Sequence, residues 1–293
     1  MSKVYLHNKY RFNSLLKVFL YLFIPFIIYG LYKNGIYLYN EKLISFVNIF
    51  RPLYFILISI LISFIFSKIN KKEFINYELL FNIIIAMIVS PSINILLFIG
   101  LLFILNLIYK FIKFNIITVF MIISIIISYI LKDSNFYNIF EKTVEHNYSL
   151  LDFIIGRGYG GVSNTFLIMS IVSFIVLCSK MNYKKQIPIM GFSVYYILTL
   201  LTSFITGTYS FDLFLNNNLI FAFIFIAPIS LFSPYSKGGC YIYGFILGLI
   251  VFIFSFIDIN IGIYITILLL SYLSPILDRF IVGKSNKGLI ETL

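Results

Sequence analysis

One short stretch of the chain has the residue types that can hold a ligand. Residues Ile154 to Phe166 read I-I-G-R-G-Y-G-G-V-S-N-T-F, with four glycines and one arginine within six residues. Glycine lets backbone amides approach a ligand closely and adopts positive φ angles at little steric cost. The same residues also suit a tight turn at a membrane surface, with Arg157 among the lipid head groups. From the residues alone, a ligand contact and a simple turn both stay open.

Other reactive groups are scarce. Cys178 and Cys240 lie far apart without a C-x-x-C partner, so they predict neither a disulfide framework nor a metal site. His7 falls in the N-terminal tail and His146 in a loop. The chain contains no nucleophile elbow and no phosphate-binding G-K-[ST] motif. We therefore predict no catalytic residue and no metal ligand.

The composition is that of a membrane protein. Of the 293 residues, 61% are hydrophobic and 11% are charged, and the mean hydropathy is +1.01. A soluble globular protein has about 25% charged residues, so this chain is built for the lipid bilayer. Residues 1–14 are polar and basic, and no small-residue cleavage site follows the first apolar run. We expect that run to be a retained membrane span.

The apolar runs predict ten membrane-spanning helices, because a helix needs roughly twenty apolar residues to cross a bilayer. Residue 90 precedes a proline and is biased away from helix, which predicts a tight turn between the third and fourth spans. One kinked or broken helix is the alternative. Almost no ionisable residue lies inside the spans. The ten predicted spans are residues 15–33, 52–69, 79–91, 94–111, 114–132, 164–180, 187–207, 217–233, 241–257 and 260–277.

The basic residues assign the two sides of the membrane. With ten spans, sixteen of the 22 lysines and arginines fall on the side of both termini. These residues accumulate on the cytoplasmic side, so we predict a multi-pass protein of the cell membrane with both termini in the cytoplasm. The net charge of +11 follows from this topology. We therefore expect the lipid bilayer as a partner and no nucleic-acid partner.

The predicted fold is an all-α polytopic membrane protein of two five-helix halves. Because five is odd, a duplicated half would be inverted relative to its twin, an architecture with sites near the membrane midplane. Ser90-Pro91 and Ser233-Pro234 would be traces of such a duplication. The predicted segments are a cytoplasmic tail (1–14), the first half (15–132), an exterior loop (133–163), the second half (164–277) and a cytoplasmic tail (278–293).

Three stretches, in order along the chain, resemble the NqrB/RnfD family. Its members are flavin-carrying membrane subunits of ion-translocating NADH:quinone and Rnf electron-transport complexes. Leu268 to Phe280 is similar to the family's last helix, with Pro275 and Asp278 on the pattern and Ser271 where an asparagine is expected. Phe232 to Gly248 is similar to the family's T-S-P, K-G and Y-G-x-x-x-G segment. The matching residues there are Ser233, Pro234, Lys237, Gly238, Tyr243, Gly244 and Gly248.

The glycine-rich stretch is the third. It is similar to the family's G-N-x-P-G-S-I-G-E-T-S, with Asn164 in place of the glutamate and with Gly156, Gly160, Val162 and Thr165 in register. The resemblance implies a flavin, FMN or riboflavin, near the outer face. It implies that the flavin-binding residues are Gly156, Gly160, Gly161 and Thr165.

The sequence also departs from the family. Members carry S/T-G-A-T in the outer loop, and its threonine bears FMN through a phosphoester bond. Residues 133–153 contain no S-G-A-T. Thr143 lies at about the right distance, but Glu141 and Glu145 flank it and would repel a phosphate. We therefore expect the flavin to be held without a covalent bond, and Thr143 is the candidate attachment point if a covalent bond forms.

Three hypotheses for the function stay open. The first is a subunit of an ion-translocating electron-transport complex that holds a flavin near the outer face, passes electrons, and has other membrane subunits as partners. The second is a flavin-free membrane scaffold of the same fold. The third is a small-solute transporter built on inverted repeats. The sequence identifies neither the ion nor the electron donor and acceptor.

The topology can be tested by thiol labelling in a variant without Cys178 and Cys240. In intact cells, a membrane-impermeant reagent should modify Asn147→Cys in the exterior loop. It should leave Asn182→Cys unmodified, because sixteen basic residues place that loop in the cytoplasm. The reverse labelling pattern would mean that the topology is inverted.

Overall fold

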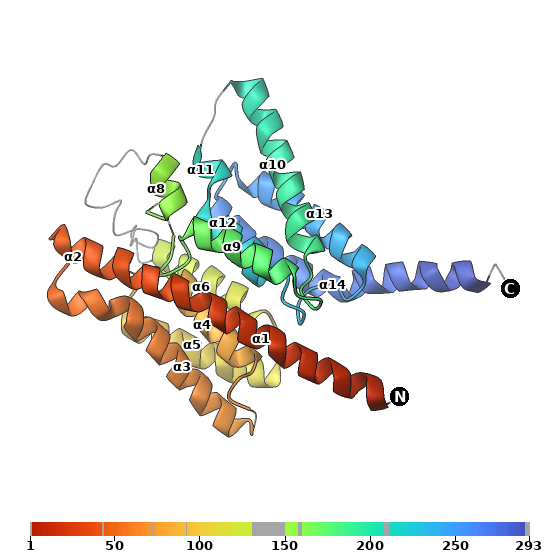
Figure 1. The fold of residues 1–293 in the computed structure, drawn as a ribbon, viewed down its shortest axis with the longest axis horizontal. Coiled ribbons are helices and arrows are strands. Elements are labelled where there is room, and N and C mark those ends of the chain that lie inside the picture. Colours follow the sequence, from red (N-terminus) through yellow and green to blue (C-terminus); the bar gives the residue numbers. More distant parts are fainter. Residues whose placement is uncertain are drawn as a thin grey trace. The chain divides into compact units, whose positions relative to one another are not determined.

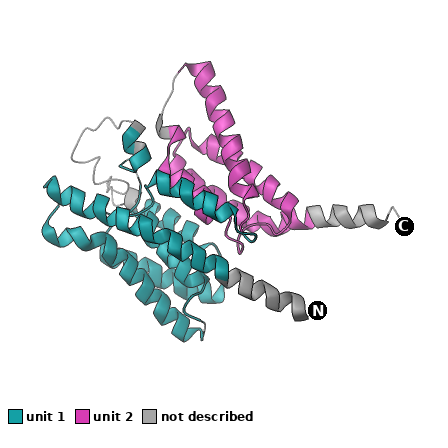
Figure 2. Cartoon of the chain, in the orientation of Figure 1, with its two compact units in different colours: residues 1–182 teal, residues 183–293 magenta. Residues whose placement is uncertain are grey.

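The fold is seen in a computed structural model that describes residues 2–42, 44–71, 73–91, 93–130, 150–157, 160–207 and 211–290. Within these ranges every regular element is helical (Figure 1). The predicted all-α class is confirmed. The chain divides into two compact units, residues 1–182 and 183–293 (Figure 2).

The described residues of the first unit form nine helical elements before its last described helix. They are α1 (Ser2–Leu31), the π-helical η1 (Tyr32–Tyr37), α2 (Leu38–Asn40), the 3-10 helix η2 (Phe46–Phe50), α3 (Arg51–Ile69), α4 (Tyr77–Ile88), α5 (Ile95–Phe111), α6 (Ile116–Ile130) and α8 (Leu150–Ile155); the described residues of this unit end with α9 (Leu167–Cys178) and the turn after it. The second unit contains α10 (Gln186–Thr206), α11 (Phe211–Phe214), α12 (Asn217–Phe221), the π-helical η4 (Ala222–Ile226), α13 (Lys237–Phe254) and α14 (Ile259–Ile290).

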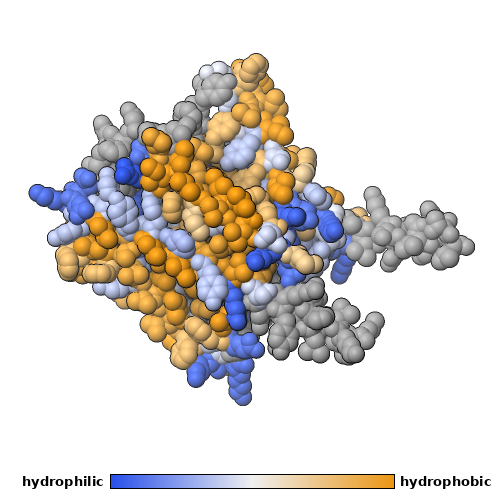
Figure 3. Space-filling view, in the orientation of Figure 1, coloured by the Kyte–Doolittle hydropathy of each residue, from blue (hydrophilic) through white to orange (hydrophobic). Residues whose placement is uncertain are grey.

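Each of the ten predicted spans contains an apolar helix. Hydrophobic side chains also cover much of the face shown in Figure 3, as a lipid-facing surface requires. The chain is therefore a polytopic membrane protein, although the crossing of the shorter helices stays a prediction. Among the described residues, five helices are long and apolar enough to cross a membrane: Ser14–Asn40, Phe46–Ile69, Gln186–Thr206, Lys237–Phe254 and Ile259–Phe280. Five are shorter: Tyr77–Ile88, Ile95–Phe111, Ile116–Ile127, Leu167–Cys178 and Asn217–Ile226.

The third and fourth predicted spans are separate helices. Helix α4 ends at Ile88, and Val89 has extended backbone angles. The side chain of Asn94 accepts a hydrogen bond from the Leu96 amide (2.9 Å), so α5 begins with its own N-cap. The chain turns at Ser90-Pro91, where a proline disfavours helix in the residue before it. The alternative of one kinked helix is wrong.

Helix α4 lies at the centre of the first unit. Every residue from Glu78 to Ile88 is buried, and α4 packs against α1, α3 and α6. Asn82 donates to the Ser63 hydroxyl of α3 (2.8 Å), and its amide exchanges hydrogen bonds with that of Asn106 on α5 (3.0 and 3.3 Å). Such polar contacts join helices where no water is available. The amides therefore fix α4 between two longer helices.

Glycines bring α13 against α10 in the second unit. A side chain at Gly244 would come within 2.6 Å of the Ile187 carbonyl oxygen, and one at Gly248 within 2.5 Å of the Gly191 carbonyl oxygen. Glycines four residues apart share a helix face and allow two backbones to meet. This packing explains the Y-G-x-x-x-G pattern noted in the sequence.

The same order of features occurs in both units. In each, a short, fully buried helix (α4, or α12 with η4) begins with an asparagine cap and precedes a Ser-Pro pair. The caps match closely: Asn76 accepts from the Leu79 amide at 3.0 Å and Asn216 from the Leu219 amide at 2.9 Å. The next helix again begins with a polar cap, Ser236 in the case of α13. This order supports a duplication, while the predicted halves and their inversion stay predictions.

Candidate functional site

The glycine-rich segment starts by ending helix α8. The backbone amides of Gly156 and Arg157 both donate to the Asp152 carbonyl, at 2.9 and 2.7 Å. Gly156 has a φ of +89°, a conformation that glycine adopts easily at a helix C-terminus. The Arg157 guanidinium pairs with the Asp152 carboxylate (3.6 Å) and lies over the Tyr37 ring. These contacts fix the direction in which the segment leaves α8.

The chain itself fills the space beside the predicted flavin-binding glycines. A side chain at Gly156 would meet the Thr165 backbone, and one at Gly161 would meet the Ile88 backbone at the end of α4. Gly160, with a φ of +155°, faces the Thr165 side chain. These glycines are therefore required by packing within the protein. Gly158 and Thr143 lie outside the described residues.

The segment pairs with the end of α4 through its backbone. The amide of Val162 donates to the Val89 carbonyl (2.9 Å), and the amide of Ser163 donates to the Met87 carbonyl (2.8 Å). The last carbonyls of a helix have no partner within the helix and need one from elsewhere when buried. The segment thus caps α4 with its own amides, and the missing side chain at Gly161 permits this approach.

Two polar side chains of the π-helix that follows α1 hold the other edge of the segment. They lie in η1, where Lys33 is only 2% exposed and Asn34 is buried. Asn34 donates to the Val162 carbonyl (2.7 Å), and the Lys33 ammonium donates to the Thr165 hydroxyl (3.3 Å). A buried charge is costly in a membrane protein and usually marks a functional position. Lys33 and Thr165 are the strongest candidate site residues in the first unit.

The sequence interpretation missed the role of Lys33. We counted it among the exterior basic residues and expected almost no ionisable side chain within the spans. The structure corrects this, because Lys33 lies buried inside the long apolar helical segment Ser14–Asn40. The extra turn width of a π-helix directs residues 33–35 inward. The only sequence signal was the polar tripeptide Lys33-Asn34-Gly35 at the end of an apolar run.

The second unit contains a polar cluster built from the family-like motifs. The Asp278 carboxylate accepts hydrogen bonds from the backbone amides of Tyr235 (2.8 Å) and Ser236 (3.0 Å) and from the Ser236 hydroxyl (2.7 Å). This carboxylate therefore fastens the end of the last span to the loop before α13. The motif residues Ser233-Pro234 and Asp278, far apart in sequence, belong to one cluster.

Lys184 completes this cluster. Its ammonium donates to the Ser233 hydroxyl (2.8 Å), to the Ser233 carbonyl (2.8 Å) and to the Ser230 carbonyl (3.3 Å). Burial lowers the pKa of Lys184 to about 8, against the opposing effects of the Cys240 thiol and the Asp278 carboxylate. Since that pKa is above 7, the ammonium is the main form at neutral pH. In the sequence, Lys184 counted only as one of the sixteen basic residues on the cytoplasmic side.

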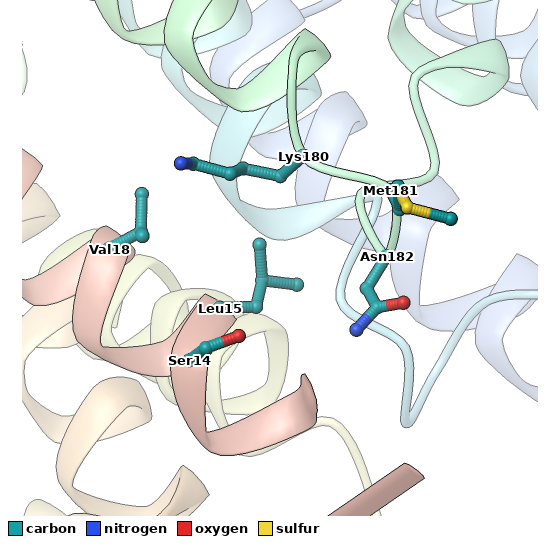
Figure 4. Close-up of a pocket in the computed structure, with 6 residues that line it drawn as sticks. All are labelled: Ser14, Leu15, Val18, Lys180, Met181 and Asn182. Atoms are coloured by element: carbon teal, nitrogen blue, oxygen red, sulfur yellow. The ribbon is translucent and has the colours of Figure 1, made fainter. Parts of the chain in front are cut away.

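A cavity of about 190 Å³ lies elsewhere in the first unit. Figure 4 shows Lys180 extending over it from the turn after α9, with the Ser14 hydroxyl on α1 below. Ser14 and Lys33 are nineteen residues apart on one helical segment, which corresponds to roughly 29 Å at 1.5 Å per residue. The cavity therefore does not belong to the site around Lys33.

Comparison with known proteins gives one family. Residues 131–287, more than half of the chain, match the NQR2, RnfD, RnfE family. The matched range contains the glycine-rich segment, Lys184 and Asp278. No curated protein matches the chain.

The tight contact between Gly161 and α4 can be tested with a matched pair of alanine variants. Gly161→Ala should lower the melting temperature of the purified protein, because its methyl group would collide with the Ile88 backbone, and such overpacking costs about 1–3 kcal/mol. Gly100→Ala is the control, since nothing lies within 4 Å of the added carbon in α5. Equal melting temperatures for both variants would contradict the packing described here.

Proposed function

Because the chain belongs to the NQR2, RnfD, RnfE family, we propose that it is a membrane subunit of an Nqr/Rnf-type ion-translocating electron-transport complex. Its partners in this proposal are the other membrane subunits of that complex. The protein lies in the cell membrane with both termini in the cytoplasm, as the distribution of basic residues predicts. A bound flavin would supply the electron transfer, and this chain would hold the flavin and set its surroundings.

The observation that carries the flavin proposal is the contact between Lys33 and Thr165. Thr165 lies in the stretch that resembles the family's flavin-contacting segment, and its hydroxyl accepts a hydrogen bond from a buried ammonium. A positive charge in such a place attracts an anionic group, whether a phosphate or a flavin that has gained electrons. In this proposal Lys33 and Thr165 would donate hydrogen bonds to FMN or riboflavin. Asn34 keeps the segment in place by holding the Val162 carbonyl.

The sequence favours a flavin held without a covalent bond. No S-G-A-T sequence occurs in the chain, and Thr143, the one candidate, is flanked by two glutamates. The Thr165 and Ile88 backbones lie where a side chain at Gly156 or Gly161 would be. The role proposed for Gly156, Gly160 and Gly161 is therefore to shape the segment that presents Thr165.

A second candidate function is a flavin-free scaffold of the same fold. The packing of Gly156 and Gly161 favours it, because the protein backbone lies where their side chains would be. In that case Lys33 and Asn34 would serve only to dock the segment against α1. The two candidates predict different flavin contents for the same purified protein.

The decisive experiment measures flavin per protein in the complex isolated from membranes. The wild type should contain flavin that separates from the chain on denaturation, so a denaturing gel should show no fluorescent band. Lys33→Met should lose the flavin, because the anionic group loses its counter-charge. Lys17→Met should keep it, since Lys17 is exposed on the same helix.

Each alternative outcome has a definite meaning. No flavin in the wild type would favour the scaffold. A fluorescent band that disappears with Thr143→Ala would establish covalent attachment at Thr143. Full flavin content in Lys33→Met, with a melting temperature equal to that of the wild type, would overturn the role proposed for Lys33.

A further inference from the structure

The surroundings of Lys184 are those of a coordinated cation. An ammonium group has three N–H donors, and three oxygens accept from this one: the Ser230 carbonyl, the Ser233 carbonyl and the Ser233 hydroxyl. The Ser233 hydroxyl donates its own proton to the Ile229 carbonyl (2.9 Å), so its lone pair faces Lys184. The Tyr235 ring lies 4.6 Å from the nitrogen, within cation–π distance. We call these three oxygens the cradle.

The cradle lies in the turns that follow a short buried helix. The buried helix of α12 and η4 ends at Ile226, and the turns that follow carry the Ser230 and Ser233 carbonyls. Both serines are buried, so bulk water does not hydrate their carbonyls freely. The cradle therefore needs a cation or a set of donors in its place.

The distances decide which ions suit the cradle. Its oxygens lie 2.8–3.3 Å from the nitrogen. Calcium binds oxygen at about 2.3–2.6 Å, and Na⁺ has nearly the same radius as Ca²⁺, so both are too small for this spacing. K⁺ and NH₄⁺ are larger and similar to each other in size. The cradle has the dimensions of a site for these larger monovalent cations.

We propose that the cradle of Ser230 and Ser233 is a monovalent-cation site that the chain fills with its own Lys184 ammonium. Removal of that ammonium opens the site to NH₄⁺ or K⁺ from solution. The tethered charge makes the fold of the loop before α13 independent of the surrounding salt. This inference does not depend on the proposed electron-transport function.

The first unit offers an independent parallel. Arg51, at the start of α3, donates to the Ile93 carbonyl (2.6 Å) in the turn that follows the buried helix α4. Lys184 lies two residues before α10, which begins at Gln186, and it too bonds carbonyls after a buried short helix. Both units thus place a basic side chain on carbonyls downstream of their short helix. A positive charge is the shared feature at both positions.

The test compares melting temperatures of the purified full-length protein in choline, sodium, potassium and ammonium chloride at pH 7 and equal ionic strength. Lys184→Ala should melt several degrees below the wild type in choline. Potassium and ammonium should restore much of this loss, and sodium should restore less. The wild type should melt at the same temperature in all four salts, because its own ammonium occupies the cradle.

Three variants make the result specific. Lys185→Ala should behave like the wild type, since Lys185 is the exposed neighbour. Lys184→Met should be destabilised without responding to the salts, because its side chain fills the space. If Lys184→Ala does not accumulate, the milder Lys184→Gln takes its place. Potassium and ammonium should then raise the melting temperature of Lys184→Gln by a smaller amount. A neutral variant with an open cradle that melts equally in choline and potassium would overturn the proposal, and so would an equal salt response in Lys185→Ala.

Discussion

Buried backbone carbonyls at the ends of two short helices are the constraint on which the rest of the structure depends. Helix α4 has twelve residues, or about 18 Å of length, while the hydrocarbon core is about 30 Å thick. A helix that stops inside the membrane leaves carbonyls that only other parts of the protein can satisfy. The first unit supplies the amides of Val162 and Ser163. In the second, the Tyr183 hydroxyl donates to the Ile224 carbonyl of η4 (2.9 Å), and the Lys184 ammonium binds carbonyls in the turns beyond η4. Each unit thus uses a distant segment to complete a broken span.

This constraint gives the glycine-rich segment a physical role before any ligand is considered. Its amides reach the Met87 and Val89 carbonyls only because Gly161 carries no side chain against the Ile88 backbone. The same contacts place Thr165 beside the buried ammonium of Lys33 in η1. A flavin site at Thr165 would therefore be built on the structural cap of α4. Structural and functional demands on these residues coincide, so a substitution there affects both.

The sequence predicted the helices well and their ends poorly. Long apolar runs identify helices because hydropathy is a local property, and all ten predicted ranges contain one. The predicted eighth range extended to residue 233, but its helix ends at Ile226, because Pro228 disfavours helix in the residue before it. Lys33 was missed because its partner Thr165 is 132 residues away, and a local sequence pattern does not show such a contact. The family-like motifs did identify Ser233-Pro234 and Asp278, although only the structure joins them into one cluster.

Hydrogen exchange of the segment containing Val162 and Ser163 tests the central claim most directly. In a folded protein an amide exchanges slowly only while its hydrogen bond is closed and shielded from water. If the segment caps α4, the amides of Val162 and Ser163 should exchange as slowly as those in the middle of α4, in detergent or in nanodiscs. Exchange of these two amides at the rate of an exposed loop, with α4 still protected, would contradict the account.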